Sequence, residues 1–217
     1  MKYICTIISY IFHPFIIPLL GLFILFQVPT LPNSLYIYDA IYFFPEQVKK
    51  EMFFVLVILT FAAPVLSLLI MYWNRMISSI ELKDRKERIY PFILITFYYI
   101  LAYFFLRYKV QDELQHPVIM SFLFGVILTF IISFIINIFL KLSLHAVGVF
   151  GVAGTILAYY QTQIDSQFWI VISLIIIGGL VTSSRVYLKA HSLNEALIGM
   201  AVGFGVLYLT VLNNWFI

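Results

Sequence analysis

Long apolar runs are the feature that most restricts how this chain can fold. Of its 217 residues, 63% are hydrophobic and only 11% are charged. A soluble domain cannot bury that much apolar surface, and the runs reach the roughly 20 residues that a helix needs to cross a bilayer. The alternating pattern of membrane-barrel strands is absent. The sequence therefore predicts an all-α, polytopic transmembrane helical bundle.

Seven apolar segments predict about six to seven spans in one integral membrane domain, residues 1–217. They cover residues 3–28, 52–73, 91–108, 117–140, 146–160, 168–182 and 195–212. The first contains Pro14 and Pro18, which predicts a kinked or re-entrant segment. The fifth is short and rich in glycine, which suits close helix packing. We divide the domain into N-terminal spans, residues 1–73, and a core, residues 83–212.

Composition gives little support to functions outside the membrane. The net charge of +3 is modest and does not indicate a nucleic-acid partner. The single cysteine, Cys5, excludes an internal disulfide and lies in an apolar run, where it is expected to pack as a small hydrophobic residue. The N-terminal run is longer than a signal-peptide core and has no obvious small-residue cleavage site, which predicts a retained span.

Basic residues are unevenly divided between the two membrane sides. With seven spans, the N-terminus and residues 74–90, 141–145 and 183–194 share one side. That side carries nine basic residues: Lys2, Arg75, Lys83, Arg85, Lys86, Arg88, Lys141, Arg185 and Lys189. The opposite side carries four: Lys49, Lys50, Arg107 and Lys109. The positive-inside rule favours the cytoplasm for the first side, although a miscounted first segment would invert the assignment.

One segment concentrates polar side chains at a membrane boundary, where charge is costly and functional sites are common. Its polar members are Ser184, Arg185, Lys189, His191, Ser192, Asn194 and Glu195. Ser192 and Glu195 fit the capping box of a helix start, which is a structural role. That role does not explain Arg185, Lys189 or His191. A helix start also offers free N–H groups to an anion, so capping and anion binding are compatible.

Two weaker polar clusters lie on the same predicted side. The first, residues 83–91, also fits a solvated surface helix in which Asp84 and Arg88 pair at i,i+4 spacing. The second, residues 143–145, also fits an ordinary helix start with a serine N-cap. These structural interpretations stay open. Together with residues 184–195, however, the two clusters place residue types that bind phosphate on one membrane face.

These clusters resemble the motifs of the type 2 phosphatidic acid phosphatase and haloperoxidase superfamily. The third motif of that family, S-R-x5-H-x3-D, is matched by Ser184, Arg185 and His191. Glu195 stands in place of its aspartate and keeps the carboxylate on an arm longer by one methylene. The order and separation of the clusters also agree, so the resemblance covers roughly residues 83–212.

The other two motifs match less completely. In the second, P-S-G-H, Ser143 and His145 match, and Leu144 replaces the glycine with a side chain that narrows the expected pocket. In the first, K-x6-R-P, Lys83 matches and Tyr90 stands at the arginine position. That replacement removes a bidentate phosphate ligand.

The resemblance implies a catalytic cycle with named roles. His191 would attack phosphorus and form a phosphohistidine, Glu195 would accept a hydrogen bond from its other ring nitrogen, and His145 would protonate the leaving oxygen and then activate water. The candidate phosphate-binding residues are Lys83, Arg185, Ser143, Ser184 and, in place of the missing arginine, Arg88. No metal ion or other cofactor is expected, because the chain lacks the carboxylate cluster of two-metal sites.

The predicted function is hydrolysis of a membrane lipid phosphate or diphosphate, such as a polyprenyl or phosphatidyl phosphate, in a bacterial cytoplasmic (inner) membrane. A non-catalytic lipid-phosphate binder or transporter and a lipid phosphotransferase are the alternatives on the same scaffold. His13, beside prolines in a kinked helix, and His116, in a loop, are interpreted as structural residues.

Overall fold

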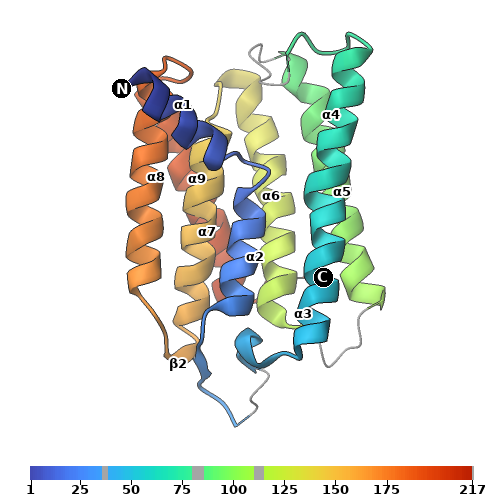
Figure 1. Ribbon diagram of the computed structural model, residues 1–217, viewed down its shortest axis with the longest axis vertical. Coiled ribbons are helices and arrows are strands. Elements are labelled where there is room, and N and C mark those ends of the chain that lie inside the picture. Colours follow the sequence, from blue (N-terminus) through green and yellow to red (C-terminus); the bar gives the residue numbers. More distant parts are fainter. Residues whose placement is uncertain (36–38, 80–85, 110–114, 217) are drawn as a thin grey trace.

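The computed structural model describes residues 1–35, 39–79, 86–109 and 115–216 (Figure 1). Its α-helices are α1 (Lys2–Ile11), α2 (Ile17–Gln27), α3 (Glu46–Val57), α4 (Ala63–Trp73), α5 (Ile89–Lys109), α6 (Pro117–Phe139), α7 (Leu144–Tyr160), α8 (Trp169–Tyr187) and α9 (Leu193–Leu212). A π-helical turn, Ile58–Ala62, joins α3 to α4, and 3-10 turns cover Ile41–Phe43 and Lys86–Arg88. The two short strands β1 (Leu31–Pro32) and β2 (Gln163–Asp165) pair antiparallel. The predicted all-α class is confirmed.

Within the described part of the chain, five helical segments are long and apolar enough to cross a membrane. They are the continuous segment Glu46–Trp73 and the helices α5, α6, α8 and α9. The fifth predicted span forms α7, whose 17 residues extend about 26 Å along the helix axis. The first predicted span is divided between two helices of 10 and 11 residues. The number of long spans is therefore smaller than the six to seven predicted, but the protein is an integral membrane protein.

The predicted kink in the first apolar segment is a complete break between α1 and α2. Pro14 has no N–H to continue the helix, and the backbone N–H groups of Ile16 and Ile17 both donate to the carbonyl of His13 (2.8 and 3.2 Å). The His13 ring adds a local contact, because its Nδ1 accepts a hydrogen bond from the N–H of Phe15 (3.4 Å). Figure 1 shows the result: α1 runs obliquely across one end of the bundle, whereas α2 runs along it.

The glycine-rich helix α7 lies at the centre of the bundle and packs closely on α9. A Cβ atom added to Gly203 of α9 would lie 2.0 Å from the carbonyl oxygen of Val147. One added to Gly154 of α7 would lie 2.6 Å from the carbonyl oxygen of Phe204. No real side chain fits at such distances, so these glycines permit the backbones to touch, as the sequence pattern predicts.

The described parts of the three predicted motif regions border the same end of the bundle. Figure 1 shows that α4, α6 and α8 finish there and that α5, α7 and α9 begin there, with α1 crossing beside them. We call this the site end. At the opposite end, His116 has a structural role: its Nδ1 accepts from the N–H of Val118 (3.1 Å) and its Nε2 donates to the carbonyl of Asp39 (3.0 Å).

Candidate active site

A pocket of about 610 Å³ lies at the site end and combines residues from distant parts of the chain. Its lining includes three histidines, His13, His145 and His191. It also includes five basic residues: Lys2, Arg88, Lys141, Arg185 and Lys189. No carboxylate is among the described residues that line it. A cavity with this composition favours an anionic ligand.

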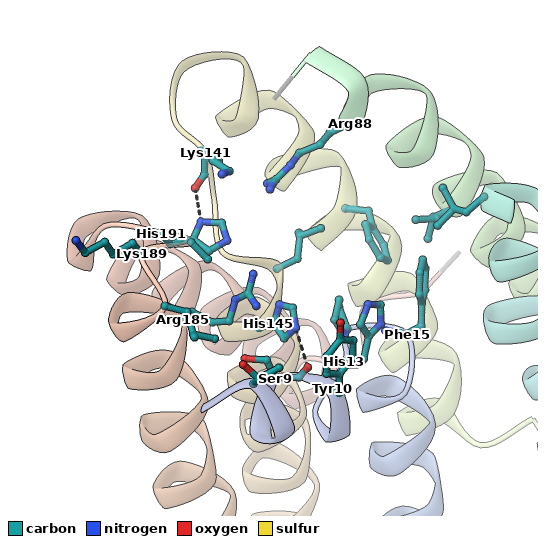
Figure 2. Close-up of a pocket in the computed structure, with 18 of the residues that line it drawn as sticks. Ser9, Tyr10, His13, Phe15, Arg88, Lys141, His145, Arg185, Lys189 and His191 are labelled. Carbon is teal, nitrogen blue, oxygen red and sulfur yellow. Dashed lines mark hydrogen bonds between the residues drawn. The ribbon is translucent and has the colours of Figure 1, made fainter. Parts of the chain in front are cut away.

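His191 is presented to this pocket by the short connection between α8 and α9. Its side chain is largely buried, and its Nδ1 lies 3.0 Å from the carbonyl oxygen of Lys141 (Figure 2). A carbonyl oxygen only accepts, so Nδ1 carries the proton and the neutral ring keeps its electron pair on Nε2. Burial, helped by the nearby charges of Arg88 and Arg185, lowers the pKa of His191 to about 4. The ring is therefore neutral at pH 7 and has the form of a nucleophile.

Glu195 does not make the hydrogen bond to His191 that the motif predicts. Its Oε2 lies 3.6 Å from His191 Nδ1 and accepts instead from the backbone N–H of Ser192 at 2.8 Å. The Ser192 hydroxyl accepts in turn from the N–H of Glu195 (3.3 Å), which completes the predicted capping box of α9. The Lys141 carbonyl is thus the group that orients His191, and the Glu195 carboxylate contributes negative charge nearby.

Glu195→Gln should separate the capping role of Glu195 from the effect of its negative charge on His191. Glutamine can also close a capping box, so the melting temperature should change by no more than about 2 °C. Loss of the negative charge beside the ring should lower kcat about tenfold, since the ring becomes cationic when it carries a phosphoryl group. Phosphate-release kinetics and thermal unfolding of the purified protein measure both effects. Unchanged turnover would leave Glu195 with the capping role alone, and Glu195→Ala is the control that removes both.

His145 lies in the first turn of α7 and is held in the opposite tautomer. Its Nε2 lies 3.1 Å from the carbonyl oxygen of Ser9, so Nε2 carries a proton and Nδ1 holds the electron pair. In the view of Figure 2, the side chain of Arg185 extends between the rings of His145 and His191. The structure thus brings together the two histidines and the arginine that the motifs single out.

Arg88 occupies the pocket, whereas Tyr90 does not. Arg88 lies in the 3-10 turn before α5, is only 7% exposed, and donates through Nη1 to the carbonyl of Leu142 (3.3 Å). Tyr90 is 62% exposed and is not among the lining residues. The guanidinium two residues earlier in the chain therefore brings a positive charge to the pocket, which the Tyr90 side chain does not.

The two serines predicted to bind phosphate are not in the lining of the pocket. The Ser184 hydroxyl donates to the carbonyl of Leu180 one turn earlier in α8 (2.8 Å), and Ser143 is fully buried. Leu144, which replaces the family's glycine, does line the pocket. Lys83 lies outside the described residues. Ser143 and Ser184 therefore remain sequence-based predictions as phosphate ligands.

The comparisons with known proteins agree with the second and third motifs. Residues 137–216 match the family model of the PAP2 superfamily. This match contains His145, Arg185, His191 and Glu195, so this segment of the chain is similar to the family that the motifs resemble. No curated protein and no solved structure matches the chain.

Much of the pocket is built by residues outside the PAP2 segment. Lys2, Thr6, Ser9 and His13 all line it, although the sequence analysis gives none of them a role in the site. Lys2, Thr6 and Ser9 are spaced by four and three residues and so lie on one face of α1, and His13 follows four residues later, just beyond the end of the helix. This polar stripe in an apolar segment is the signal that could have identified them. His13 therefore has a structural contact with Phe15 and also lines the pocket.

Two further lysines were also missed as candidates for the site. Lys141 contributes both its carbonyl, which binds His191, and a side chain that lines the pocket. Lys189 has a positive φ of 54°, and the N–H groups of Lys189 and Ala190 donate to Val186 and Arg185 at the end of α8. This arrangement is a Schellman motif, in which glycine is the usual residue at the position of Lys189.

The described residues contain no group of three or more His, Cys, Asp or Glu side chains that could hold a metal ion. The residues that line the pocket offer imidazole, guanidinium, ammonium and hydroxyl groups. Such groups can attack phosphorus, transfer protons and neutralise phosphoryl oxygens.

Proposed function

We propose that this PAP2 protein is a lipid phosphatase that hydrolyses a membrane lipid phosphate or diphosphate through a phosphohistidine on His191. The observation that carries the proposal is the pair of imidazoles in one cationic pocket. A backbone carbonyl fixes the tautomer of each ring, with Nε2 free on His191 and Nδ1 free on His145. Arg185 lines the same pocket.

In the first step, Nε2 of His191 attacks phosphorus. The N–P bond forms as the P–O bond to the lipid breaks, and the electron pair of that bond goes to the lipid oxygen. Nδ1 of His145 carries no proton in the resting site, so it first takes the acidic proton of the bound phosphate monoanion. The lipid oxygen then takes this proton and leaves as the alcohol, or as the lipid monophosphate when the substrate is a diphosphate. Arg185 and Arg88 neutralise the phosphoryl oxygens as charge builds up on them.

In the second step, a water molecule replaces the lipid oxygen in the pocket. Nδ1 of His145 accepts a proton from the water as its oxygen bonds to phosphorus and the N–P bond breaks. The electron pair of the N–P bond returns to His191, His145 passes its proton to the inorganic phosphate, and the phosphate leaves. Each group ends the cycle in its starting state.

A second, apolar pocket supports a lipid as the substrate. It adjoins the first, because both are lined by Pro14, Phe130 and Leu144. Its other lining residues lie on α2, α6, α7 and α9 and are almost all apolar. A lipid whose phosphate occupies the cationic pocket could place the first carbons of its tail here.

The purified protein should release phosphate from lipid phosphates without added metal. The expected result is turnover of polyprenyl or phosphatidyl phosphates in detergent that is unchanged within about twofold by excess EDTA, because the described residues hold no carboxylate cluster of the two-metal type. Turnover that stops in EDTA and returns with magnesium would contradict the metal-independent route. Binding of the lipid without release would indicate a binder or transporter, and transfer to an acceptor lipid would indicate a phosphotransferase.

We also propose that the site end faces the cytoplasm of a bacterial inner membrane. Of the described basic residues, Lys2, Arg75, Lys86, Arg88, Lys141, Arg185 and Lys189 belong to the site end, and Lys49, Lys50, Arg107 and Lys109 to the other end. The positive-inside rule favours the richer end as cytoplasmic.

Single cysteines test this orientation in intact cells after Cys5 is replaced. With Arg75→Cys at the site end and Lys109→Cys at the other, an impermeant thiol reagent should label only the second. Labelling of Arg75→Cys with protection of Lys109→Cys would place the site outside the cell. Cells permeabilised before labelling provide the control, because both cysteines should then react.

A further inference from the structure

The C-terminal end of α1 contacts His145 directly. Ser9 lies in the last turn of α1, where the final carbonyl groups of a helix have no partner within it. The carbonyl of Ser9 accepts the hydrogen bond from His145 Nε2 at 3.1 Å, and Figure 2 shows this bond at the edge of the pocket. The same helix end carries the negative pole of the helix dipole, which favours a protonated imidazole.

The ring of His13 makes a second contact with the same residue. Its centroid lies 5.7 Å from that of His145, and the two rings are nearly perpendicular at 77°. His13 is itself held in place, because its Nδ1 accepts from the N–H of Phe15 in the turn between α1 and α2. His145 is therefore oriented by one hydrogen bond and one edge-to-face ring contact, both from residues 9–13.

We propose that the C-terminal end of α1, through the Ser9 carbonyl and the His13 ring, positions His145 for proton transfer. This inference rests on the proposed function. The Ser9 carbonyl does for His145 what the Lys141 carbonyl does for His191: each accepts from one ring nitrogen and leaves the other for chemistry. The positioning element lies outside residues 137–216, so this PAP2 segment depends on the N-terminal helix for an aligned acid.

The role of the acid determines which measurement can detect its misalignment. A lipid alkoxide is a poor leaving group and needs the proton from His145 Nδ1 as the P–O bond breaks. A p-nitrophenolate leaves readily without a proton. Loss of alignment should therefore lower kcat/KM for a lipid phosphate much more than for p-nitrophenyl phosphate, whereas a general loss of folded protein lowers both equally.

His13→Ala tests the ring contact by this ratio. We expect kcat/KM to fall about tenfold for a lipid monophosphate and less than about twofold for p-nitrophenyl phosphate, a modest share of what general acid catalysis contributes. His145→Ala should show the same selectivity with a larger loss. Ile7→Ala is the matched control, because Ile7 is on α1 but is exposed and does not line the pocket.

An ester at one peptide bond tests the carbonyl contact. Replacing Tyr10 by its α-hydroxy analogue keeps the side chain and turns the Ser9 carbonyl into an ester carbonyl, which accepts hydrogen bonds more weakly. The same replacement at Tyr3 weakens the Lys2 carbonyl at the other end of α1 and is the control. Only the Tyr10 ester should change the ratio between the two substrates.

The outcomes separate the two proposals. No wild-type turnover of either substrate would overturn the proposed function and this inference with it. Wild-type turnover with an equal loss on both substrates in the His13 and Tyr10 variants would overturn the positioning role alone. A gain in activity in these variants would also overturn it, because α1 would then be holding His145 away from the substrate.

Discussion

Replacing His191 by asparagine should lower phosphate release at least about 10³-fold, since no other group can take over the covalent step. Asparagine is chosen because its side-chain N–H can still donate to the Lys141 carbonyl, which His191 Nδ1 occupies at 3.0 Å. The loss should then reflect missing chemistry and not an unpaired buried carbonyl. Phosphate release from a lipid phosphate and the melting temperature of the same preparation are the two measurements.

His116→Asn supplies the control for this variant. His116 is also buried and hydrogen-bonded to a backbone carbonyl, but it lies at the opposite end of the bundle. It should alter stability and leave kcat unchanged. Retained turnover in His191→Asn would rule out the phosphohistidine route. A stable radiolabelled phosphoenzyme in the wild type, trapped by rapid denaturation and absent from His191→Asn, would provide direct support.

Replacing Arg185 by alanine should lower kcat/KM by about 10²- to 10³-fold, the effect of removing one strong electrostatic group from a transition state. Arg185 is the one motif arginine of the PAP2 segment that lines the pocket, and in the view of Figure 2 its side chain extends between the rings of His145 and His191. Arg185→Lys should recover only part of the activity, because lysine keeps the charge but not the planar pair of donors.

Lys189→Gly is the matched control for Arg185→Ala. It also removes a cation from the pocket, but at a residue with φ of 54°, where glycine relieves strain and does not disturb the end of α8. We expect a loss of less than about tenfold, in line with a single flexible charge near the mouth of a site. Equal losses in the two variants would mean that the pocket responds to total charge and that Arg185 has no special position.

Much of the fold could be predicted because bilayer insertion depends on local composition. Each helix of the bundle coincides with an apolar run, Pro14 marks the break between α1 and α2, and the glycines of α7 mark its contact with α9. The structure has fewer long spans than predicted because some apolar segments form helices that are near or below the length needed to cross a bilayer. The break leaves α1 and α2 too short to span, and α7 is only 17 residues long.

The site was less predictable because a sequence motif identifies the side chains of a site but not the groups to which they form hydrogen bonds. The family resemblance made Glu195 the orienting partner of His191, but the Glu195 carboxylate closes the capping box, and a backbone carbonyl accepts the hydrogen bond from Nδ1. Carbonyl groups are present at every residue, so no sequence pattern distinguishes the one at Lys141. The burial of Ser143 is likewise a result of packing, whereas the Ser184 hydroxyl bonds to a carbonyl one turn earlier in its own helix.

The residue types along the chain are enough to establish a helical membrane protein and to single out Arg185, His145 and His191, because hydropathy and motif identity are local properties. The partners that orient both histidines, and the contribution of α1 to the pocket, depend on how helices distant in sequence pack together. His145 and Ser9 are 136 residues apart and meet because α1 crosses the end of the bundle where α7 begins. Long-range contacts of this kind follow from the shape of the whole bundle, which no local sequence pattern predicts.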